Sequence, residues 1–317
     1  MKYIDTFKEG MNVQDVYLCR QRKYSLMTKN GKPYDEVTIQ DKTGTIVGKI
    51  WDPNSDGIED CDDYDYIEVI GKVTEFNGQL QVKVDRLRKA DEDEYIPADY
   101  IPTSEYDIEE MYGKVLKLVE AVKNPYLNAL LKHFLVDDAD MVKAFKSQSA
   151  AKTLHHGFIG GLLEHSLSVA TMCWHIAGHY NFLNRDLLIT AALLHDIGKI
   201  KEFSDFPVND YTDEGNLLGH IVMGSEMIGE AAKNIEGFPP VLLNELKHCI
   251  LSHHGKFEFG SPKKPAIAEA IALNFADDMD AKLEYCKELF NSPSAEGGDW
   301  LGYNRFFEGN FRRTTEK

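Results

Sequence analysis

The chain has 317 residues and a formal net charge of −17, and this length can bury the cores of one large or two ordinary domains. It contains no run of eighteen or more apolar residues, and it begins MKYIDTFKEG without a signal-like apolar block, so we expect a soluble cytoplasmic protein and no membrane span. The five cysteines are scattered and never spaced as C-x-x-C, which favours reduced thiols over a disulfide framework or a zinc ribbon.

Residues 1–90 are predicted to form strands joined by tight turns. The pairs Asn30-Gly31 and Asn77-Gly78 are strong hairpin signals, because both central residues of a type I′ turn need positive φ. Five strands in such a short stretch favour a small closed barrel. The alternation of apolar and polar residues places these strands at 13–27, 34–40, 45–51, 66–75 and 79–87.

The long first strand, the gap at residues 52–65 and the sequence QDKTGTIVGKIWD resemble the OB-fold of nucleic-acid-binding proteins. Such a fold binds single strands through stacked aromatic rings and through cations along the backbone path. Each candidate also has an ordinary alternative, since Trp51 could belong to the core and Lys83 or Arg86 to a solvated strand face. The candidates for contact with a strand are Arg20, Arg22, Lys23, Tyr24, Tyr34, Trp51, Phe76, Lys83, Arg86 and Arg88.

Residues 91–105 are predicted to be an acidic linker between two domains. They contain two prolines and a run of acids from Asp91 to Glu94, with little apolar periodicity. The wider stretch 91–140 holds 4 Lys and Arg against 13 Asp and Glu, which is more than half of the excess negative charge of the chain. The regions on either side are only mildly acidic, so the net charge does not exclude nucleic acid as a partner.

From residue 106 onward the pattern predicts an all-α domain over residues 106–290, followed by a C-terminal tail at 291–317. Apolar residues recur at helical spacing, and Pro125 suits the first turn of a helix. The predicted helices cover 107–122, a segment beginning at Pro125, 161–180, 185–196, 220–233, 240–252 and 266–290.

A series of residues that commonly bind metals runs through these helices, each at or near a helix end and with apolar helical neighbours. An inward histidine alone is more often a hydrogen-bonded core residue, and an inward aspartate is often a cap or part of an ion pair. Together, however, several imidazoles and two carboxylates match what Mn²⁺, Fe or Zn²⁺ accepts from protein. The sequence therefore predicts a metal centre between helices, formed by His165, His195, Asp196, His220, His253, His254 and Asp277.

The motifs GLLEHS around His165, LLHDIGK around His195 and FADDMD around Asp277 resemble the signature of the HD-domain metal-dependent phosphohydrolases. The additional His220 and the pair His253-His254 resemble the members of that superfamily that hold two metals. Behind an OB-fold, the sequences HHGFIGGLLEHS, LGHIVMGSEMI and LSHHGKFEFGSPKKP are similar to the YhaM family of 3′→5′ exoribonucleases.

This resemblance implies a role for each ligand. His165, His195, Asp196 and Asp277 match the ligands of a first ion, and Asp196 would bridge to a second ion held by His220 and by His253 or His254. Of that pair His253 is favoured, because its helical neighbours are more apolar. We expect two divalent ions, Mn first, with Fe, Co or Zn as alternatives.

Other residues of the motifs have open roles. Lys199 matches a lysine that contacts the phosphate in related two-metal members, and its alternative is a surface lysine at a helix end. His156 is expected to line the substrate channel or to cap a helix. Glu164 is either a supporting or a surface acid, and Asp278 and Asp280 either orient ligands or are solvated.

The expected function is hydrolysis of single-stranded RNA from its 3′ end, with nucleoside monophosphates as products and DNA as a second substrate. A phosphohydrolase of small nucleotides or cyclic dinucleotides is the first alternative, although Gly255-Lys256-Phe257-Glu258 replaces the G-Y-P element of the cyclic-dinucleotide enzymes. A non-catalytic single-strand-binding protein is the second alternative. A homo-oligomer is open, because the aromatic residues Trp300, Tyr303, Phe306 and Phe307 could serve assembly or pack back on the helical domain.

Overall fold

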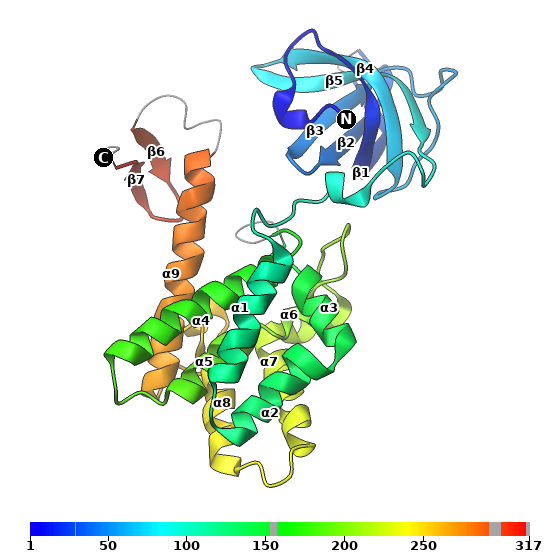
Figure 1. Cartoon of the computed structure of the whole chain (residues 1–317). Helices are drawn as coiled ribbons and strands as arrows, with labels where there is room; N and C mark the ends of the chain where they lie inside the picture. Colours follow the sequence, from blue (N-terminus) through cyan, green and yellow to red (C-terminus); the bar gives the residue numbers. More distant parts are fainter. Residues whose placement is uncertain (29, 153–156, 292–298, 315–317) are drawn as a thin grey trace. The chain divides into compact units, whose positions relative to one another are not determined.

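The structure is a computed structural model that describes residues 1–28, 30–152, 157–291 and 299–314. It divides into two compact units (Figure 1). The first unit holds Met1–Thr103 with Phe206–Val208, and the second holds Ser104–Asp205 with Asn209–Lys317.

The first unit is a closed barrel of five strands in the order β1-β2-β3-β5-β4. Neighbouring strands pair in antiparallel fashion except β3 and β5, which pair in parallel. The predicted OB-type barrel is confirmed, with strand ends within two residues of those expected. The strands are β1 (Asn12–Met27), β2 (Pro33–Asp41), β3 (Gly44–Ile50), β4 (Tyr66–Phe76) and β5 (Gln79–Lys89).

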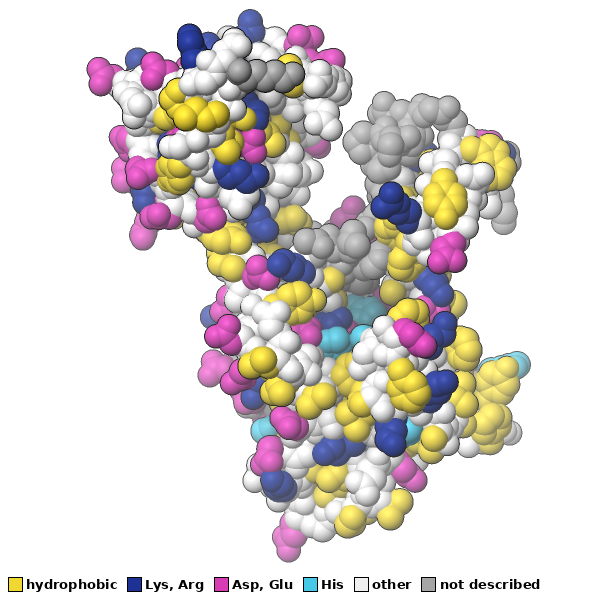
Figure 2. Space-filling model, turned by 180° about the vertical axis from the view of Figure 1, so that it is seen from behind, with side chains coloured by type: hydrophobic (Ala, Val, Ile, Leu, Met, Phe, Trp, Pro, Cys, Tyr) yellow, Lys and Arg dark blue, Asp and Glu magenta, His cyan; other side chains and the backbone are white. Residues whose placement is uncertain are grey.

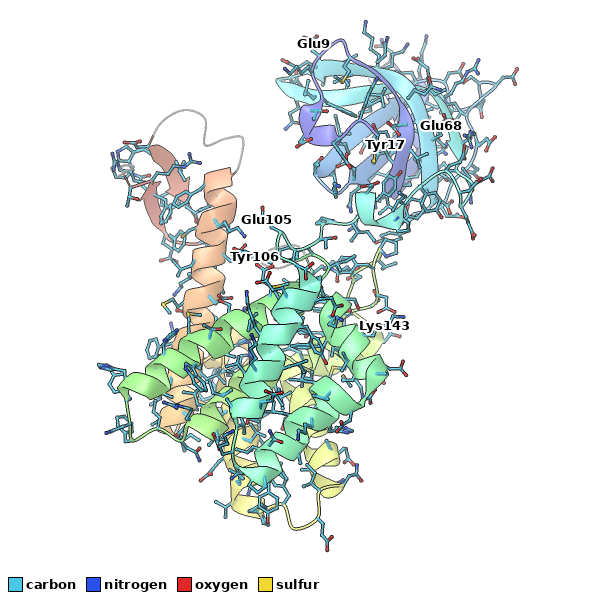
Figure 3. All side chains as sticks on the ribbon, viewed as in Figure 1. Glu9, Tyr17, Glu68, Glu105, Tyr106 and Lys143 are labelled. Carbon is cyan, nitrogen blue, oxygen red and sulfur yellow. The ribbon has the colours of Figure 1, made fainter. Side chains whose placement is uncertain are left out.

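The turn chemistry and the period-two pattern explain this barrel. Asn77 and Gly78 have φ values of 53° and 77°, as a type I′ turn between β4 and β5 requires. Along β5, Val82 and Val84 point into the core while polar neighbours face outward. Figure 3 shows Tyr17 within the barrel, where its ring is fully buried and its hydroxyl donates to the carbonyl of Lys2 at 2.8 Å.

Residues 91–105, predicted to be an acidic linker, are largely exposed, and only Tyr100 and Ile101 are buried among those described. Tyr95 stacks on Tyr66 with ring centroids 3.7 Å apart, and the buried Tyr100 meets Tyr66 edge-on. The side-chain amide of Gln40 donates to the carbonyl of Tyr100 at 3.0 Å. The segment thus contains, next to its run of acids, two aromatic residues that attach it to the barrel unit.

The second unit is mainly helical, as the pattern predicted. The sequence missed α3 and the short α6, and it placed the start of α7 several residues late, at His220. The helices are α1 (Ile108–Ala121), α2 (Pro125–Lys132), α3 (Ala139–Ser147), α4 (Gly161–His179), α5 (Arg185–Leu194), α6 (Lys199–Glu202), α7 (Asp213–Lys233), α8 (Pro240–Ser252) and α9 (Ala268–Asn291), with a π-helical turn at His133–Asp137.

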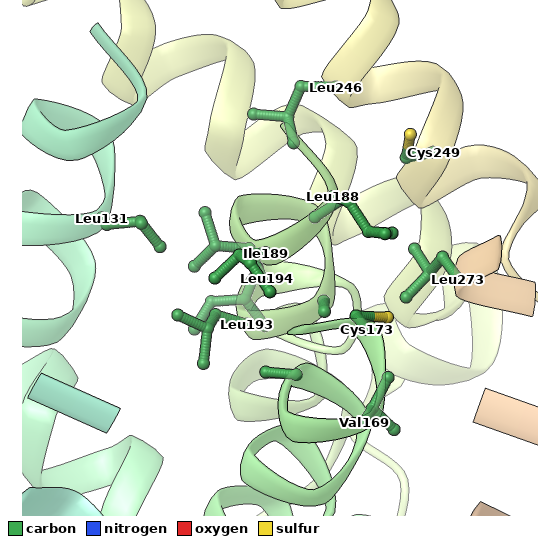
Figure 4. Close-up of a cluster of buried hydrophobic side chains, with 14 of the residues drawn as sticks. Leu131, Val169, Cys173, Leu188, Ile189, Leu193, Leu194, Leu246, Cys249 and Leu273 are labelled. Atoms are coloured by element: carbon green, nitrogen blue, oxygen red, sulfur yellow. The ribbon is translucent and has the colours of Figure 1, made fainter. Parts of the chain in front are cut away.

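The core of this unit is built around α5. Every residue of α5 from Leu187 to Leu194 is buried, so this helix is apolar on all sides. Figure 4 shows Leu188, Ile189 and Leu193 of α5 among side chains from the surrounding helices, including Leu246 of α8. The C-terminal end of α5 therefore delivers the next residues of the chain to the interior.

The C-terminal tail forms a two-stranded hairpin, β6 (Trp300–Asn304) and β7 (Gly309–Arg312). Phe306 and Phe307 pack against Tyr285 of α9, with ring centroids 4.8 and 5.7 Å from it. Two of the four tail aromatics thus pack back on the helical unit, whereas Trp300 and Tyr303 are exposed. Among the described residues, no helix is long and apolar enough to span a bilayer.

Candidate metal centre and nucleic-acid interface

All seven predicted metal ligands converge in the helical unit. His165 lies on α4 and Asp277 on α9, while His195 and Asp196 follow directly after α5. His253 and His254 follow α8 in the same way, and His220 lies on α7. Gly219 interrupts α7 with φ 74° and ψ 153°, so His220 opens a new helical segment, as predicted.

Six of these residues form two groups that could each hold an ion. His165, His195 and Asp277 offer ligand atoms within 4.8 Å of one another, and so do His220, His253 and His254. Both histidines of the His253-His254 pair belong to the second group, so the geometry offers both as ligands, and the preference for His253 stays a prediction.

Asp196 lies between the two groups and turns one oxygen toward each. Its Oδ2 is 3.5 Å from His165 Nε2 and 3.4 Å from His195 Nε2. Its Oδ1 is 3.4 Å from His220 Nε2 and 3.7 Å from His253 Nε2. This is the arrangement that a carboxylate bridging two ions requires.

Main-chain carbonyls orient three of the five imidazoles. Nδ1 of His195 donates to the carbonyl of Ala192 at 2.8 Å, and Nδ1 of His253 donates to that of Ile250 at 2.7 Å. Nδ1 of His254 donates to the carbonyl of Phe259 at 2.7 Å. A carbonyl can only accept, so Nδ1 carries the proton and Nε2 presents its lone pair to the centre.

Carboxylates orient the other two imidazoles. Asp280 Oδ2 lies 2.7 Å from Nδ1 of His165, and Glu202 Oε1 lies 3.0 Å from Nδ1 of His220. The same Glu202 oxygen accepts the backbone N–H of His220 at 2.9 Å, at the point where Gly219 has broken the helix. Asp280, whose role the sequence left open, thus contacts a ligand, and Glu202 was missed.

Several buried polar atoms at this centre lack protein partners. Within the described part of the chain, Asp196 Oδ1, His220 Nε2 and His253 Nε2 have no hydrogen-bond partner. Each such atom costs about 1–3 kcal/mol when buried without one. A divalent cation would satisfy all three at once, and a set of imidazoles and carboxylates suits Mn, Fe, Co or Zn. The residues present therefore fit the expected metal.

The electrostatics differ among the predicted ligands. Burial opposes protonation of His165, yet its hydrogen bonds with Asp277 and Asp280 raise its pKa to about 10, so this imidazole must lose a proton before it can bind an ion. Burial lowers the pKa of His253 well below its usual value, so this imidazole is neutral. Burial opposes ionisation of Asp196, yet Lys199 and His195 hold its pKa well below the usual range. Burial likewise opposes ionisation of Asp277, and the hydrogen bond from His165 outweighs it and lowers the pKa of that carboxyl.

Lys199 belongs to the centre and is not a surface lysine at a helix end. Its side chain is 13% exposed, and its Nζ lies 2.7 Å from Asp196 Oδ2 while donating to the carbonyl of Ala150 at 2.6 Å. The preceding residue, Gly198, lets the backbone of α7 pass close to this turn, because a Cβ there would lie 2.1 Å from the carbonyl oxygen of His220.

A cavity of about 870 Å³ opens onto the centre. His165, Asp196, Lys199, His254 and Asp277 all line it. Figure 2 shows histidine side chains on this face of the helical unit, with basic and apolar side chains near them. The two ligand groups can therefore be reached by a solute.

A row of charged residues crosses the outer face of the barrel. In the strand register Lys23 is opposite Glu36, Glu36 opposite Lys49, Lys49 opposite Lys83, and Lys83 opposite Lys72. The row thus holds four cations from four strands around one acid. Lys49 and Lys72 complete it and were not among the sequence candidates.

Three comparisons place this geometry among known proteins. The model of the HD domain matches residues 162–282, a span that contains all seven predicted ligands. The YhaM 3′-5′ exoribonuclease of Bacillus licheniformis is 35% identical over 85% of this chain and 85% of its own. The YhaM 3′-5′ exoribonuclease of Bacillus velezensis is 36% identical over 86% of both chains.

The chain belongs to the YhaM family. Both relatives are named as 3′-5′ exoribonucleases, which are enzymes that act on phosphodiester bonds. The second OB-fold domain of replication protein A from Methanococcus maripaludis matches 28% of this chain and 92% of its own, with 20% identity and a TM-score of 0.23. At this score the likeness adds nothing to the strand topology, which identifies the barrel.

Two aromatic residues of the barrel that were expected to contact nucleic acid, Trp51 and Tyr24, are exposed. Trp51 is 48% exposed, which removes the alternative that it belongs to the core, and its ring lies 5.3 Å from that of Tyr34. Lys49 Nζ is 5.0 Å from the Tyr34 ring. Tyr24 is also exposed, although its hydroxyl donates to Asp60.

The basic residues of the barrel that were expected to contact a strand differ in their exposure. Lys83 and Arg86 are exposed, with Lys83 paired to Asp85 at 2.9 Å. Arg20 is half-buried, and its guanidinium lies 5.2 Å from the ring centre of Tyr64. His156 lies outside the described residues.

The expectation that Arg22 contacts a strand is wrong. Its side chain is only 3% exposed and forms an ion pair with Asp35 at 3.1 Å. It also donates to the carbonyl of Glu59 at 2.7 Å. A period-two pattern could not reveal this, because β1 changes register with β2 on either side of Arg22, between Cys19 and Gln21 and again between Lys23 and Leu26.

The acids around the ligands show what a sequence signal can find. Asp280 is three residues from Asp277, so helical spacing indicates it. Glu202 follows the HDIGK motif by three residues, and only the fold brings it to His220. Glu164 proves to be a buried acid that accepts from Ser104 Oγ at 2.5 Å.

Proposed function

We propose that this chain is a metal-dependent 3′→5′ exoribonuclease that removes nucleoside monophosphates from single-stranded RNA and also accepts DNA. The observation that carries the proposal is Asp196, which presents one oxygen to each of two ligand groups. The YhaM relatives are named 3′-5′ exoribonucleases, and they match 85% of this chain. They therefore suggest the class of reaction.

Two ions would be held at this centre. His165, His195, Asp277 and Asp196 Oδ2 would bind one, and His220, His253, His254 and Asp196 Oδ1 would bind the other. The chemistry that such a pair supplies when bound is activation of a shared water and neutralisation of the phosphate oxygens. Mn²⁺ suits the mixed imidazole and carboxylate donors, with Fe, Co and Zn as alternatives.

The residues of the chain do the rest of the work at this site. Asp196 keeps the two ligand groups in register, and neutral imidazoles complete the set without cancelling the charge of the ions. Lys199 holds Asp196 Oδ2 and lines the cavity, so its ammonium is positioned to stabilise negative charge that develops on the phosphate.

The barrel would retain the strand that the helical unit shortens. In the cation row of Lys23, Lys49, Lys72 and Lys83, Lys23 and Lys49 pair with Glu36 and Lys83 pairs with Asp85, so a phosphate would exchange with these acids. The exposed ring of Trp51 offers a stacking surface. Neither contact reads base edges, so binding would show little sequence preference. RNA and DNA would both bind.

The test is a product ladder. Single-stranded RNA labelled at its 5′ end is incubated with purified protein and Mn²⁺, and the products are separated by length. We expect stepwise shortening from the 3′ end and release of nucleoside monophosphates, with no reaction in the presence of a chelator. Internal cleavage, shortening from the 5′ end, or activity that survives complete metal removal would each contradict the proposal.

A further inference from the structure

The cavity at the metal centre carries aromatic and basic side chains that the proposed hydrolysis does not use. Phe259, Phe275 and Lys256 line it together with Asp196 and other predicted ligands. Phe275 is 67% exposed and Phe259 is 58% exposed. A phenylalanine is normally buried, so two exposed rings in one reactive cavity suggest a ligand with a flat apolar face.

The fold fixes both rings relative to the ligands. Phe275 stands two residues before Asp277 on α9. Phe259 is joined to the second ligand group, because its carbonyl accepts Nδ1 of His254 at 2.7 Å. Asn274 of α9 donates to the carbonyl of His253 at 2.6 Å and so ties the two segments together.

The chain beyond His254 follows a course that needs glycine. Gly255 has φ +76°, and a Cβ there would lie 2.5 Å from the Asn274 amide. The turn at Phe257–Phe259 then places Lys256 Nζ 5.1 Å from the ring centre of Phe259. Lys256 forms no ion pair with any described residue, so its charge is available to an anion.

We propose that Phe275 and Phe259 stack on nucleobases at the 3′ end of the strand and that Lys256 contacts a phosphate of the same terminal segment. This inference rests on the proposed exonuclease function and adds the group that the active site recognises. Every base offers a π-face, so such a subsite is independent of sequence, and base stacking on protein rings contributes strongly to single-strand binding.

The test uses oligoribonucleotides with an ordinary 3′ end and oligomers with one abasic nucleotide at the last or second-last position. Steady-state turnover of each is measured with Mn²⁺. We expect Phe275→Ala and Phe259→Ala to raise KM for the ordinary end by about 5-fold or more, with a much smaller change in kcat. Phe275→Trp keeps an aromatic ring at this position, so its KM for the ordinary end should equal that of the wild type.

The abasic oligomers separate stacking from a structural role of the ring. For one of the two abasic oligomers, the KM of the wild type should rise by about the same factor as an alanine variant shows on the ordinary end. On that oligomer the alanine variant of the ring that has lost its base should have nearly the same KM as the wild type. The matched controls are Leu283→Ala, another exposed apolar residue of α9, and Phe257→Ala, which is 58% exposed like Phe259 but does not line the cavity. Both should behave as wild type.

Lysine variants test the phosphate contact. Lys256→Ala should weaken binding of ordinary and abasic ends equally and should reduce the salt dependence of binding. Lys282 also lines the cavity, but it pairs with Asp278 at 2.6 Å, so Lys282→Ala should have the smaller effect.

The outcomes distinguish the two levels of the proposal. A wild-type protein that does not shorten RNA overturns the exonuclease function itself. An active wild type with unchanged KM in Phe275→Ala and Phe259→Ala overturns the stacking subsite alone. Equal losses on ordinary and abasic ends in these two variants also overturn it, because the rings would then support the fold and not the base.

Discussion

At the scale of single residues, Asp196 connects the two predicted ligand groups. Its two oxygens face four histidines, and Lys199 contacts one of them. Because it is buried and ionised, its removal leaves several polar groups without a counter-charge.

Replacing Asp196 by Asn should abolish hydrolysis, with at least a 100-fold loss of kcat, because an amide cannot bridge two cations. Strand binding should be retained, since the barrel is unaffected. Activity and bound metal are measured on the same samples, and Glu226→Gln, an exposed change on α7, serves as control. Full activity with one ion fewer would contradict the bridging role.

Glu202 orients a ligand without being one, so its loss should appear in metal binding. In Glu202→Gln we expect an affinity for the second ion that is lower by about 10- to 100-fold, and activity that recovers at high Mn²⁺. A metal titration of activity measures this. Glu214→Gln, an exposed acid in the first turn of α7, should leave the titration unchanged. A change of equal size in both variants would point to general charge effects.

The sequence named the seven candidate ligands and offered Asp280 as a residue that could orient them, but it did not indicate Glu202. Motif resemblance supplies residue types at given positions, and the structure brings all seven together. The partners of Nδ1 depend on where the chain passes in space: Glu202 reaches His220 because Gly219 breaks α7 and Gly198 permits close approach. The helix start at His220 was predicted, but the close approach at Gly198 depends on two segments that only the fold brings together.

At the scale of elements, the strands and long helices follow from their patterns, while the segments between them do not. The Asn77-Gly78 turn and the apolar spacing of α4, α5 and α8 were sufficient for prediction. The acids that dominate the composition of segment 91–105 are exposed, but the composition did not show that Tyr95 and Tyr100 pack on Tyr66. An acidic composition predicts that a segment is solvated only if none of its large side chains is buried.

The central position of α5 makes a stability prediction. Leu188→Ala removes a fully buried side chain, so the free energy of unfolding should fall by about 2–5 kcal/mol. Leu217→Ala, at an 83% exposed position of α7, should change it by less than about 0.5 kcal/mol. Denaturant unfolding of the full chain measures both. Similar midpoints for the two variants would show that α5 is not the core of its unit.

At the scale of the whole molecule, an acidic chain handles a polyanion by placing its cations locally. The net charge is −17, yet four lysines share one row on the barrel and two predicted ion sites lie in the helical unit. Binding should therefore depend on a few specific cations and not on the overall field.

The double variant Lys72→Ala/Lys83→Ala tests this division of labour. Binding of a long strand should weaken, and the slope of log affinity against log salt should decrease by about 2, because each removed ammonium leaves one phosphate without its cation. Turnover of a dinucleotide should not change. Lys114→Ala/Lys233→Ala, on exposed helix faces, is the control. Equal loss on dinucleotide and long strand would argue against the barrel as a strand-holding unit.

Three of the five imidazoles take their orientation from main-chain carbonyls, at Ala192, Ile250 and Phe259. Every residue has such a carbonyl, so no side-chain substitution at these three positions deletes the anchor itself. The centre is thus robust to mutational drift around three of its rings and fragile at two, His165 and His220, whose anchors are carboxylates. Saturation mutagenesis that measures activity would therefore detect the two acids, Asp280 and Glu202. It would not detect the three carbonyl anchors.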